Sequence, residues 1–244
     1  MEKLFDVVHE DAVLLVINKP AGLVCHPTKG DEYSSLISRV RLHLGSEVHP
    51  HLVNRLDRET SGIVIVAKDD TTARGLRKIW ESRAVQKEYL AIVHGHVQEK
   101  QGAIDASLGK DVASVVAIKD TVVPGGAASQ TDFAVEKRFT RAEGDFTLLR
   151  VLPHTGRKHQ IRIHLAYIGH PIVGDKMYGG DEDLYMALVE DRLTEEQWNK
   201  LILPHHALHA RAVRYNWQEQ QISYCCEPEK WFKGFYEGGN LPLA

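Results

Sequence analysis

The sequence predicts an α+β fold in which a long, mostly antiparallel mixed β-sheet is flanked by helices. Short apolar runs rich in β-branched residues, 12–18 and 62–67, are typical of buried strands. Residues 131–139 and 145–152 alternate between apolar and polar side chains like an antiparallel strand pair. Other segments repeat apolar residues every three or four positions, as helices do, so we expect helices packed on a sheet.

The composition is that of a globular protein with a sizeable core. Of the 244 residues, 43% are hydrophobic and 26% are charged. No apolar run approaches the roughly 20 residues that span a bilayer, and the N-terminal stretch lacks the features of a signal peptide. Three cysteines, two of them adjacent, make a poor disulfide framework and favour a reducing compartment. We therefore expect a cytoplasmic protein without a membrane partner.

Charge is distributed unevenly along the chain. The net charge of −3 by itself argues against a nucleic-acid partner. Residues 55–87, however, carry a balance of +3 and residues 150–176 a balance of +4, whereas residues 181–196 carry −6. This distribution is compatible with a basic surface for nucleic acid on a mildly acidic protein.

The N-terminal part predicts a strand, a turn and a helix. The run 12–18 is followed by Lys19–Gly22, where Pro and Gly turn the chain. Lys19 either faces a site or lies in solvent. Residues 33–45 carry apolar side chains at helical spacing, and Gly45 is suited to end the helix.

A charged cluster precedes the central apolar run. Arg55, Asp57 and Arg58 lie within four residues, just before the strand predicted over 62–67. A loop thus delivers a carboxylate, between two guanidinium groups, to the end of a buried strand, and the cations favour the ionised form of Asp57. The alternative interpretation is a surface turn that carries solvated charges.

A helix and a strand are predicted next. Asp70 or Thr71 is suited to cap the helix. The run 87–93 is rich in β-forming residues, and its Tyr89 would ordinarily belong to the core. The polar face of the helix is either solvated or contacts phosphate, and its cations are Arg74, Arg77, Lys78 and Arg83.

Residues 154–175 form a second informative block, after a loop-rich stretch with little signal over 96–128. Apolar residues recur in the block at helical spacing, with Thr155 suited to cap the helix and Gly169 to end it. Arg162 lies at the margin of the buried face, where a cation needs a partner. The elements predicted after the block are an acidic helical segment over 181–203, a strand over 206–215 and an edge strand over 221–226.

Other kinds of site find little support in the sequence. Fourteen histidines invite a metal hypothesis, but no Cys-x-x-Cys or His-Glu-x-x-His pattern accompanies them. On a strand, His205 and His209 would lie about 13 Å apart, too far to share one ion. No glycine-rich phosphate loop or nucleophile elbow occurs either. We therefore expect no metal and no cofactor.

The charged cluster carries a resemblance to a known family. The stretch Arg55-Leu56-Asp57-Arg58-x-Thr60-Ser61-Gly62 resembles the signature of the RluA-type RNA pseudouridine synthases, in which the Asp is catalytic. Asn54 departs from the His that many members carry, but it lies outside the motif core. The resemblance covers about 12–228 of a single expected domain, 1–244, without an S4 module. It implies the family's catalytic fold with a central cleft, and an insertion of one or two helices at about 181–203.

Two further motifs assign roles by the same resemblance. Lys-x-Tyr at 87–89 matches the strand whose tyrosine meets the target base, so Tyr89 is expected to stack on uracil and take part in proton transfer. The family motif Gly-Arg-x-His-Gln-Ile-Arg matches 156–162, and its last Arg pairs with the catalytic Asp. Arg162 is therefore expected beside Asp57.

The resemblance implies an isomerase that converts uridine in ribosomal or transfer RNA to pseudouridine without a cofactor. Asp57 is expected to act as nucleophile or as base, and the sequence does not choose between these roles. Arg55 is expected to fill the space that the flipped base vacates, or else to clamp a backbone phosphate. RNA is the expected partner of a monomeric protein, and its other expected contacts are Arg58, Lys87, Arg157 and Lys158.

Two other functions stay open at this point. One is a non-catalytic RNA-binding or chaperone protein on the same fold. The other is a glycoside-type hydrolase, which would pair Asp57 with a second carboxylate within roughly 5–10 Å. No second acid stands in an equally special setting in the sequence.

Overall fold

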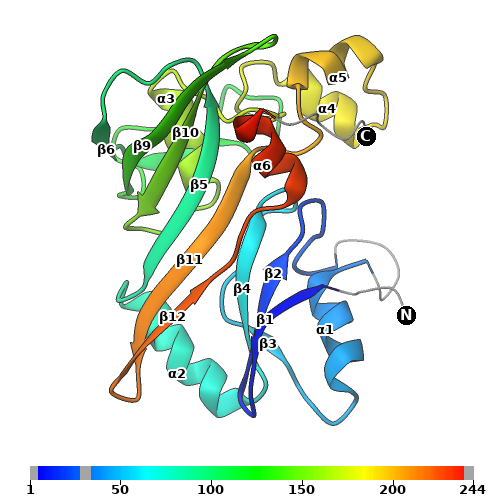
Figure 1. Ribbon diagram of the computed structural model, residues 1–244, viewed down its shortest axis with the longest axis vertical. Helices are drawn as coiled ribbons and strands as arrows, with labels where there is room; N and C mark the ends of the chain where they lie inside the picture. The colour runs from blue at the N-terminus through cyan, green and yellow to red at the C-terminus, as the bar shows by residue number, and fades with distance from the viewer. Residues whose placement is uncertain (1–4, 28–33, 239–244) are drawn as a thin grey trace. The chain divides into compact units, whose positions relative to one another are not determined.

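The computed structural model describes residues 5–27 and 34–238, which form two compact units. The first unit comprises the described part of Met1–Glu88 together with His209–Glu229. The second comprises Tyr89–Leu208 and the described residues from Lys230 onward. Each unit combines strands with helices (Figure 1), which confirms the predicted α+β class. The single domain over the whole chain stays a prediction.

The first unit is built on a mixed sheet. Its strands are β1 (Asp6–Glu10), β2 (Leu14–Lys19), β3 (His51–Leu52), β4 (Ser61–Ala67), β11 (Leu208–Trp217) and β12 (Gln220–Cys225). The order is β1-β2-β4-β11, with β3 on β4 and β12 on β11. These pairs are antiparallel except for β4 and β11, which run parallel. All four strands predicted for this part of the sequence are thus confirmed.

The central strand β4 is buried along its whole length because a helix covers each face. On one face, Val64 and Val66 pack with side chains of α1 (Leu36–Leu44). On the other face, Ile63 and Ile65 pack with Leu76 of α2 (Asp70–Glu81). A strand covered on both sides has no polar face, which is why the sequence shows an unbroken apolar run here instead of an alternating pattern.

The ends of these two helices differ in how well the sequence predicted them. Gly45 ends α1 as expected, and the helix begins after Ser35; residue 33 of the predicted segment lies outside the described residues. The cap of α2 is Asp69, so the predicted caps Asp70 and Thr71 are wrong by one or two positions. Asp69 has the extended backbone that an N-cap needs, and its carboxylate accepts a hydrogen bond from the Thr72 N–H.

The second unit holds an antiparallel sheet in the order β5-β10-β9-β6. Its strands are β5 (Gln86–His94), β6 (Gln101–Asp105), β9 (Gln130–Arg141) and β10 (Gly144–Pro153), and β7 (Leu108–Lys110) pairs separately with β8 (Asp120–Val122). The predicted pair over 131–139 and 145–152 is confirmed as β9 and β10. Residues 96–128 contain three of these strands, which are too short to produce a clear alternation in the sequence.

Four helices are described in the second unit. They are α3 (Gln160–Tyr167), α4 (Asp183–Val189), α5 (Glu195–Leu201) and α6 (Lys230–Glu237). Two of them, α4 and α5, confirm the helical segment predicted over 181–203. The predicted cap Thr155 is wrong, since α3 begins after His159; the Thr155 hydroxyl instead donates to the Gln160 side chain at 2.6 Å. Every described helix is too short or too polar to span a lipid bilayer.

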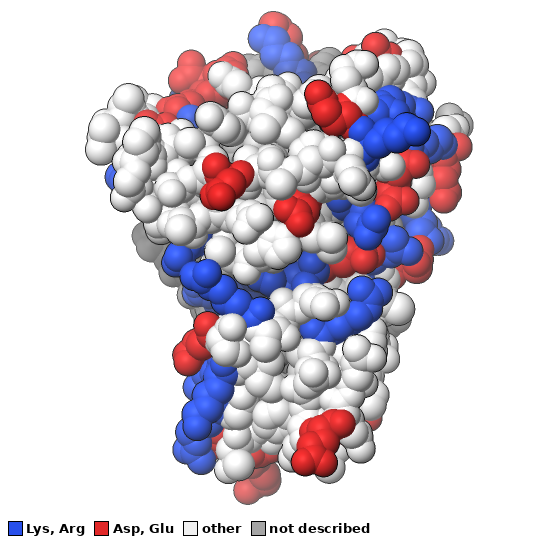
Figure 2. Space-filling model, turned by 90° about the vertical axis from the view of Figure 1, so that its left-hand side faces the viewer, with Lys and Arg blue, Asp and Glu red and all other residues white. Residues whose placement is uncertain are grey.

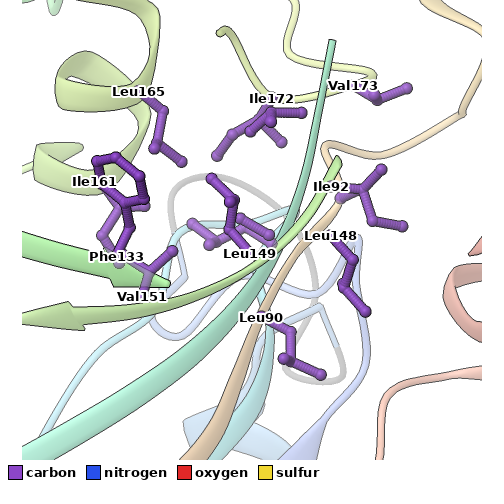
Figure 3. Packing of buried hydrophobic residues seen from close by; sticks show 14 of the residues in the cluster. Leu90, Ile92, Phe133, Leu148, Leu149, Val151, Ile161, Leu165, Ile172 and Val173 are labelled. Atoms are coloured by element: carbon purple, nitrogen blue, oxygen red, sulfur yellow. The ribbon is translucent and has the colours of Figure 1, made fainter. Parts of the chain in front are cut away.

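One hydrophobic cluster fixes α3 to the sheet of the second unit. Figure 3 shows Ile161 and Leu165 of α3 directed toward side chains from the strands, among them Leu149 and Val151 of β10. Leu149 and Leu165 are fully buried, and Val151 has no exposed surface either. Burial of apolar area on this scale stabilises the position of the helix. The position of Arg162, the next residue after Ile161, is therefore set by the core.

Gly62, the last residue of the Arg55–Gly62 motif, is expected to tolerate no side chain. Its φ is +113°, and a Cβ would lie 2.2 Å from the carbonyl oxygen of Ala210 on β11. Gly62→Ala is expected to lower the free energy of unfolding by about 3 kcal/mol or more, as measured by urea denaturation.

The matched control is Gly144→Ala. Gly144 also has a positive φ, +137°, but nothing lies within 4 Å of its added Cβ. The free energy of unfolding of this variant is expected to fall by only about 1 kcal/mol, because of backbone strain. Equal losses in the two variants would contradict the close approach of β11 to β4 as the reason for this glycine.

Candidate active site

Asn54 fixes the start of the loop that carries Asp57. Its side-chain nitrogen donates a hydrogen bond to the Ile63 carbonyl at 3.0 Å, and its side-chain oxygen accepts one from the Ile65 N–H at 2.8 Å. Both partners belong to β4, so the amide extends the hydrogen bonding of the buried strand to the loop. Asn54 occupies the position where the family resemblance would place His, and here its amide supplies both a donor and an acceptor.

Lys19 fixes the other end of the loop. The residue has no exposed surface, and its ammonium donates hydrogen bonds of 2.8–3.0 Å to three carbonyl oxygens, those of Pro20, Leu23 and Arg58. The interpretation of Lys19 as a solvent-exposed turn residue is therefore wrong. Cys25 adds a weaker tie, because the Leu56 N–H lies 3.5 Å from its Sγ.

The charges around Lys19 act on its protonation. Burial lowers the pKa of Lys19 to about 8, while the negative forms of Cys25, Glu229 and Asp57 act in the opposite direction. Lys19 is thus close enough to Asp57 for their charges to attract each other. Burial also raises the pKa of the Cys25 thiol, which makes a reactive thiolate at this position unfavourable.

The loop keeps its charged side chains accessible although its backbone is fixed. Arg55 and Arg58 are exposed, and Asp57 is half-buried. Arg58 Nε donates to the Gly22 carbonyl at 3.2 Å, which ties this side chain to the turn after β2. The sequence-predicted group of one carboxylate and two guanidinium groups therefore lies on one loop of the first unit.

The last residues of the motif are structural. Ser61 Oγ donates to Nδ1 of His209 at 2.9 Å, and Nε2 of that histidine donates to the Cys226 carbonyl at 3.2 Å. The carbonyl can only accept, so this network fixes the tautomer of His209. His209 thus joins β4, β11 and the segment after β12. Among the described residues, no group of three or more potential metal ligands is found.

In the second unit, Asp175 holds the guanidinium of Arg162. Arg162 is 7% exposed; its Nε donates to Asp175 Oδ2 at 2.7 Å and its Nη2 to Oδ1 at 2.9 Å. The same carboxylate accepts from the N–H groups of Met177 and Tyr178. The ring of Tyr178 lies 5.0 Å from the guanidinium carbon, a cation–π distance.

The electrostatics of this pair are those of a buried ion pair. Burial by itself would raise the pKa of Asp175, but the charge and hydrogen bonds of Arg162 hold that pKa well below its usual range. Sequence reasoning missed Asp175. The available signal was an acid next to Gly174 at the end of the informative block 154–175, the only acid in that basic stretch.

Two polar side chains of α3 fix the helix to its surroundings. His164 is fully buried; its Nε2 donates to the Ala106 carbonyl and its Nδ1 accepts from the Thr131 hydroxyl, both at 2.9 Å. Gln160 Nε2 donates to the Gln130 carbonyl and contacts the same hydroxyl, also at 2.9 Å. The motif at 156–162 is therefore in part a structural anchor that presents Arg162.

The other residues predicted to contact RNA differ in whether their side chains already bond to groups of the protein. Lys158 Nζ pairs with Asp120 at 2.9 Å and donates to the Ile118 carbonyl at 2.7 Å, so its charge is matched within the protein. Arg157 is exposed, with its Nε 3.3 Å from the Ala128 carbonyl. Lys87 is half-buried on β5, where burial and the charge of Arg83 lower its pKa. Their RNA contacts stay predictions.

The meeting of the three predicted catalytic side chains also stays a prediction. Asp57 belongs to the first unit, whereas Tyr89 and Arg162 belong to the second. Tyr89 is half-buried on β5 and packs against the hydrophobic cluster of its own unit. The pairing of Arg162 with Asp57 and the central cleft likewise stay predictions.

The sequence is similar to proteins of known family. A family model described as RNA pseudouridylate synthase matches residues 13–167. An uncharacterized RNA pseudouridine synthase of Aquifex aeolicus (strain VF5) is 37% identical over 180 residues, which cover 71% of this chain and 56% of the relative. Ribosomal large subunit pseudouridine synthase C of Haemophilus influenzae is 37% identical over 209 residues, 86% of this chain and 60% of that protein. The chain thus spans little more than half the length of these curated relatives.

Solved structures agree with the sequence match. The human RNA pseudouridylate synthase domain containing 1 has a TM-score of 0.74 and 25% identity, covering 95% of this chain and 86% of that one. The human RNA pseudouridylate synthase domain containing 4 has a TM-score of 0.71 and 27% identity, covering 93% of this chain and 90% of that one. The matched span 13–167 includes Asp57, Tyr89 and Arg162. Since that span is more than half of the sequence, the chain belongs to the RNA pseudouridylate synthase family.

Proposed function

We propose that this chain isomerises uridine to pseudouridine in RNA, with Asp57 as the catalytic carboxylate. The observation that carries the proposal is the Asp57 loop: a half-buried carboxylate held on a fixed backbone, within the segment that the family model matches. A catalytic group gains rate when its position is fixed before the substrate binds. Lys19 and Asn54 supply that fixation from two sides.

The reaction is an isomerisation, so the atoms balance without a co-reactant. The N-glycosidic bond of the uridine breaks, the uracil rotates, and a bond forms between the ribose and a ring carbon; that carbon gives up its proton, and the ring nitrogen that left the ribose takes one up. Asp57 acts either as the nucleophile or as the base that removes the ribose 2′ proton. Both roles need an ionised carboxylate, which the charge of Lys19 and the two guanidinium groups of the loop favour.

The proposal assigns a positioning role to Arg162. Asp175 binds the Nε edge of the guanidinium, and in the proposed complex Nη1 meets the carboxylate of Asp57. Tyr89 stacks on the target base and takes part in proton transfer. Arg55 fills the space left by the flipped base, and further backbone contacts come from Arg58, Lys87, Arg157 and Lys158.

The proposed substrate is RNA of the large ribosomal subunit. Support comes from relatives in Haemophilus influenzae and Zymomonas mobilis, whose names assign them to that subunit. Transfer RNA is the alternative substrate. The proposed site of action is the cytoplasm, in keeping with three cysteines that are all free thiols, and the proposed active form is a monomer.

Asp57→Asn is expected to reduce pseudouridine formation at least about 100-fold, because the amide supplies neither a nucleophile nor a base. Melting temperature and RNA affinity are expected to stay close to wild type, since the amide has the same shape. The measurement is nucleoside mass spectrometry of a large-subunit rRNA transcript after single-turnover incubation.

The control for this variant is Asp70→Asn, which changes an exposed carboxylate of the same unit. A rate for Asp57→Asn within a few fold of this control would contradict the catalytic role. Wild-type protein that binds the transcript without forming pseudouridine would instead support the non-catalytic alternative. Release of free uracil would support the glycoside-type hydrolase.

Asp175→Asn is expected to lower the free energy of unfolding at pH 7 by about 3–5 kcal/mol, because it strips a buried cation of its partner. It is also expected to lower kcat more than it raises KM, since Arg162 would lose its orientation. The folded pKa of Asp175 is depressed. The stability from the pair is therefore complete above the unfolded pKa of about 4 and is lost as pH falls toward the folded value.

The stability difference from wild type is thus expected to be largest near neutral pH and to shrink below about pH 4. Asp132→Asn is the matched control, because the carboxylate of Asp132 pairs with the exposed His154. Its free energy of unfolding is expected to fall by about 1 kcal/mol or less. An unchanged kcat in folded Asp175→Asn protein would contradict the positioning role of the pair.

A further inference from the structure

The exposed face of α2 is a second concentration of positive charge in the first unit. Arg77 and Lys78 lie three and four residues after Arg74, so the three side chains share one side of the helix. Arg83 follows just after the helix ends, and all four side chains are exposed. Figure 2, which draws one face of the molecule, shows Lys and Arg side chains in groups. We call these four residues the α2 surface.

None of the four side chains forms a salt bridge within the described residues. Arg74 Nη2 lies 3.4 Å from the Thr71 hydroxyl, an uncharged partner. Other cations of the same unit are matched: Lys68 pairs with Glu10 at 2.8 Å, and Glu88 lies 3.6 Å from Arg211 and 3.8 Å from Arg214. The α2 surface therefore carries charge that no salt bridge within the described residues neutralises, although the charge of Arg74 helps to lower the pKa of Asp69 at the start of the helix.

This arrangement does little for the stability of the helix itself. Arg74 and Lys78 are four residues apart, and like charges at that spacing destabilise a helix. The α2 helix is held by its buried face, through Leu76 and its neighbours in the hydrophobic cluster. Lys78 in the last turn matches the helix dipole, and Asp70 and Glu81 lie four residues from Arg74 and Arg77, so the exposed cations have small and partly opposing effects on the helix.

Arg83 occupies a position where glycine is the ordinary residue. The helix ends in a Schellman motif: the Arg83 N–H bonds the Trp80 carbonyl, and the Ala84 N–H bonds the Ile79 carbonyl at 3.3 Å. The residue after the cap must then adopt a left-handed backbone, and Arg83 has φ +60°. A residue with a Cβ is strained there.

Other helix ends of the chain show which residues or contacts accompany a left-handed backbone at this position. Gly45 follows α1 and Gly169 follows the cap of α3, so neither is strained, while the exposed Asp191 follows the cap of α4 with φ +54° and belongs to a residue type that tolerates this conformation. Ile202 ends α5 with φ +66°, but its side chain packs against the core of the second unit. Arg83 makes no such contact and is exposed, so packing does not account for it. What Arg supplies there is charge.

The α2 surface is also continuous along the chain with the candidate site. Arg83 lies close enough to Lys87 for its charge to help lower the pKa of that lysine. Lys87 is on β5, two residues before Tyr89. An anionic chain bound at Lys87 would therefore find further cations in the direction of α2.

We propose that the α2 surface binds the phosphate backbone of the substrate RNA, outside the nucleotides that enter the active site. This inference rests on the proposed function, and it adds a second contact region to it. Backbone contacts carry no sequence information and set the register of the nucleic acid. Exposed Lys and Arg side chains without carboxylate partners suit that role, since each contact releases a counterion.

The first test removes three charges at once, in the variant Arg74→Gln/Arg77→Gln/Lys78→Gln. The probe is a fluorescein-labelled transcript of large-subunit rRNA, titrated at several salt concentrations. Each lost phosphate contact lowers the slope of log K against log salt by about 0.7–0.9, so a decrease of about 2 is expected, with Kd weaker by about tenfold. The single-turnover rate at saturating enzyme is expected to stay at the wild-type value.

The matched control changes three cations that are already paired: Arg150→Gln/Arg192→Gln/Lys200→Gln. Their partners are Glu136, Glu190 and Glu196. This variant has the same net charge as the first, so it corrects for the general effect of charge on RNA binding. Its Kd is expected to stay within about twofold of the wild-type value. Its slope of log K against log salt is expected to stay within about 0.5 of the wild-type slope.

The second test is Arg83→Gly, for which the two explanations of Arg83 predict opposite results. If the residue is there for its charge, the glycine variant binds RNA more weakly, while its melting temperature stays equal or rises by about 1–3 °C. If Arg83 had only a structural role, the melting temperature would fall and RNA binding would not change. Arg83→Lys keeps the charge and is expected to retain wild-type affinity.

The outcomes separate this inference from the proposed function. Pseudouridine formation by wild type, together with wild-type Kd and salt slope in the α2 variants, would overturn the α2 surface alone. If the α2 variants lose RNA binding but the wild-type protein forms no pseudouridine, the α2 surface would be supported and the catalytic proposal overturned. A wild-type protein that does not bind the transcript would overturn both.

Discussion

The buried ammonium of Lys19 is the constraint on which the geometry of the Asp57 loop depends. A cation without exposed surface is unfavourable unless hydrogen bonds replace its water, and three carbonyl oxygens do so here. One of them belongs to Arg58, next to Asp57. The loop cannot move away without leaving the charge unsolvated, so the desolvation of one side chain fixes the backbone around another.

In the second unit, an ion pair compensates the buried cation. Arg162 lies on a helix whose neighbouring residues pack in the core, and a guanidinium there needs a charged partner. Asp175 supplies it and is itself held by two backbone N–H groups. Such a pair adds little net stability compared with apolar residues, but it determines where the guanidinium points. That is the property which the proposed role of Arg162 requires.

Charges that position and charges that bind are therefore distinguishable by their surroundings. Lys19 and Arg162 are buried and held by fixed partners, as positioning groups must be. The α2 cations are exposed and form no salt bridge in the described residues, which suits them to exchange counterions with a polyanion. The net charge of −3 conceals this difference, because it averages over residues that have different neighbours.

The sequence by itself determined the longer strands, most helices and the loop that presents Asp57, because periodicity, turn residues and charge spacing are local, whereas short strands such as β3, β7 and β8 left no pattern. It misplaced the caps at Asp70 and Thr155, since several residues there are suited to a cap and only the backbone conformation selects one. Tertiary structure alone decided that Lys19 is buried and that Asp175 binds Arg162. The Lys19 ammonium meets the carbonyl of a residue 39 positions away, and no local pattern encodes which atoms fill the space around a charge once distant segments pack.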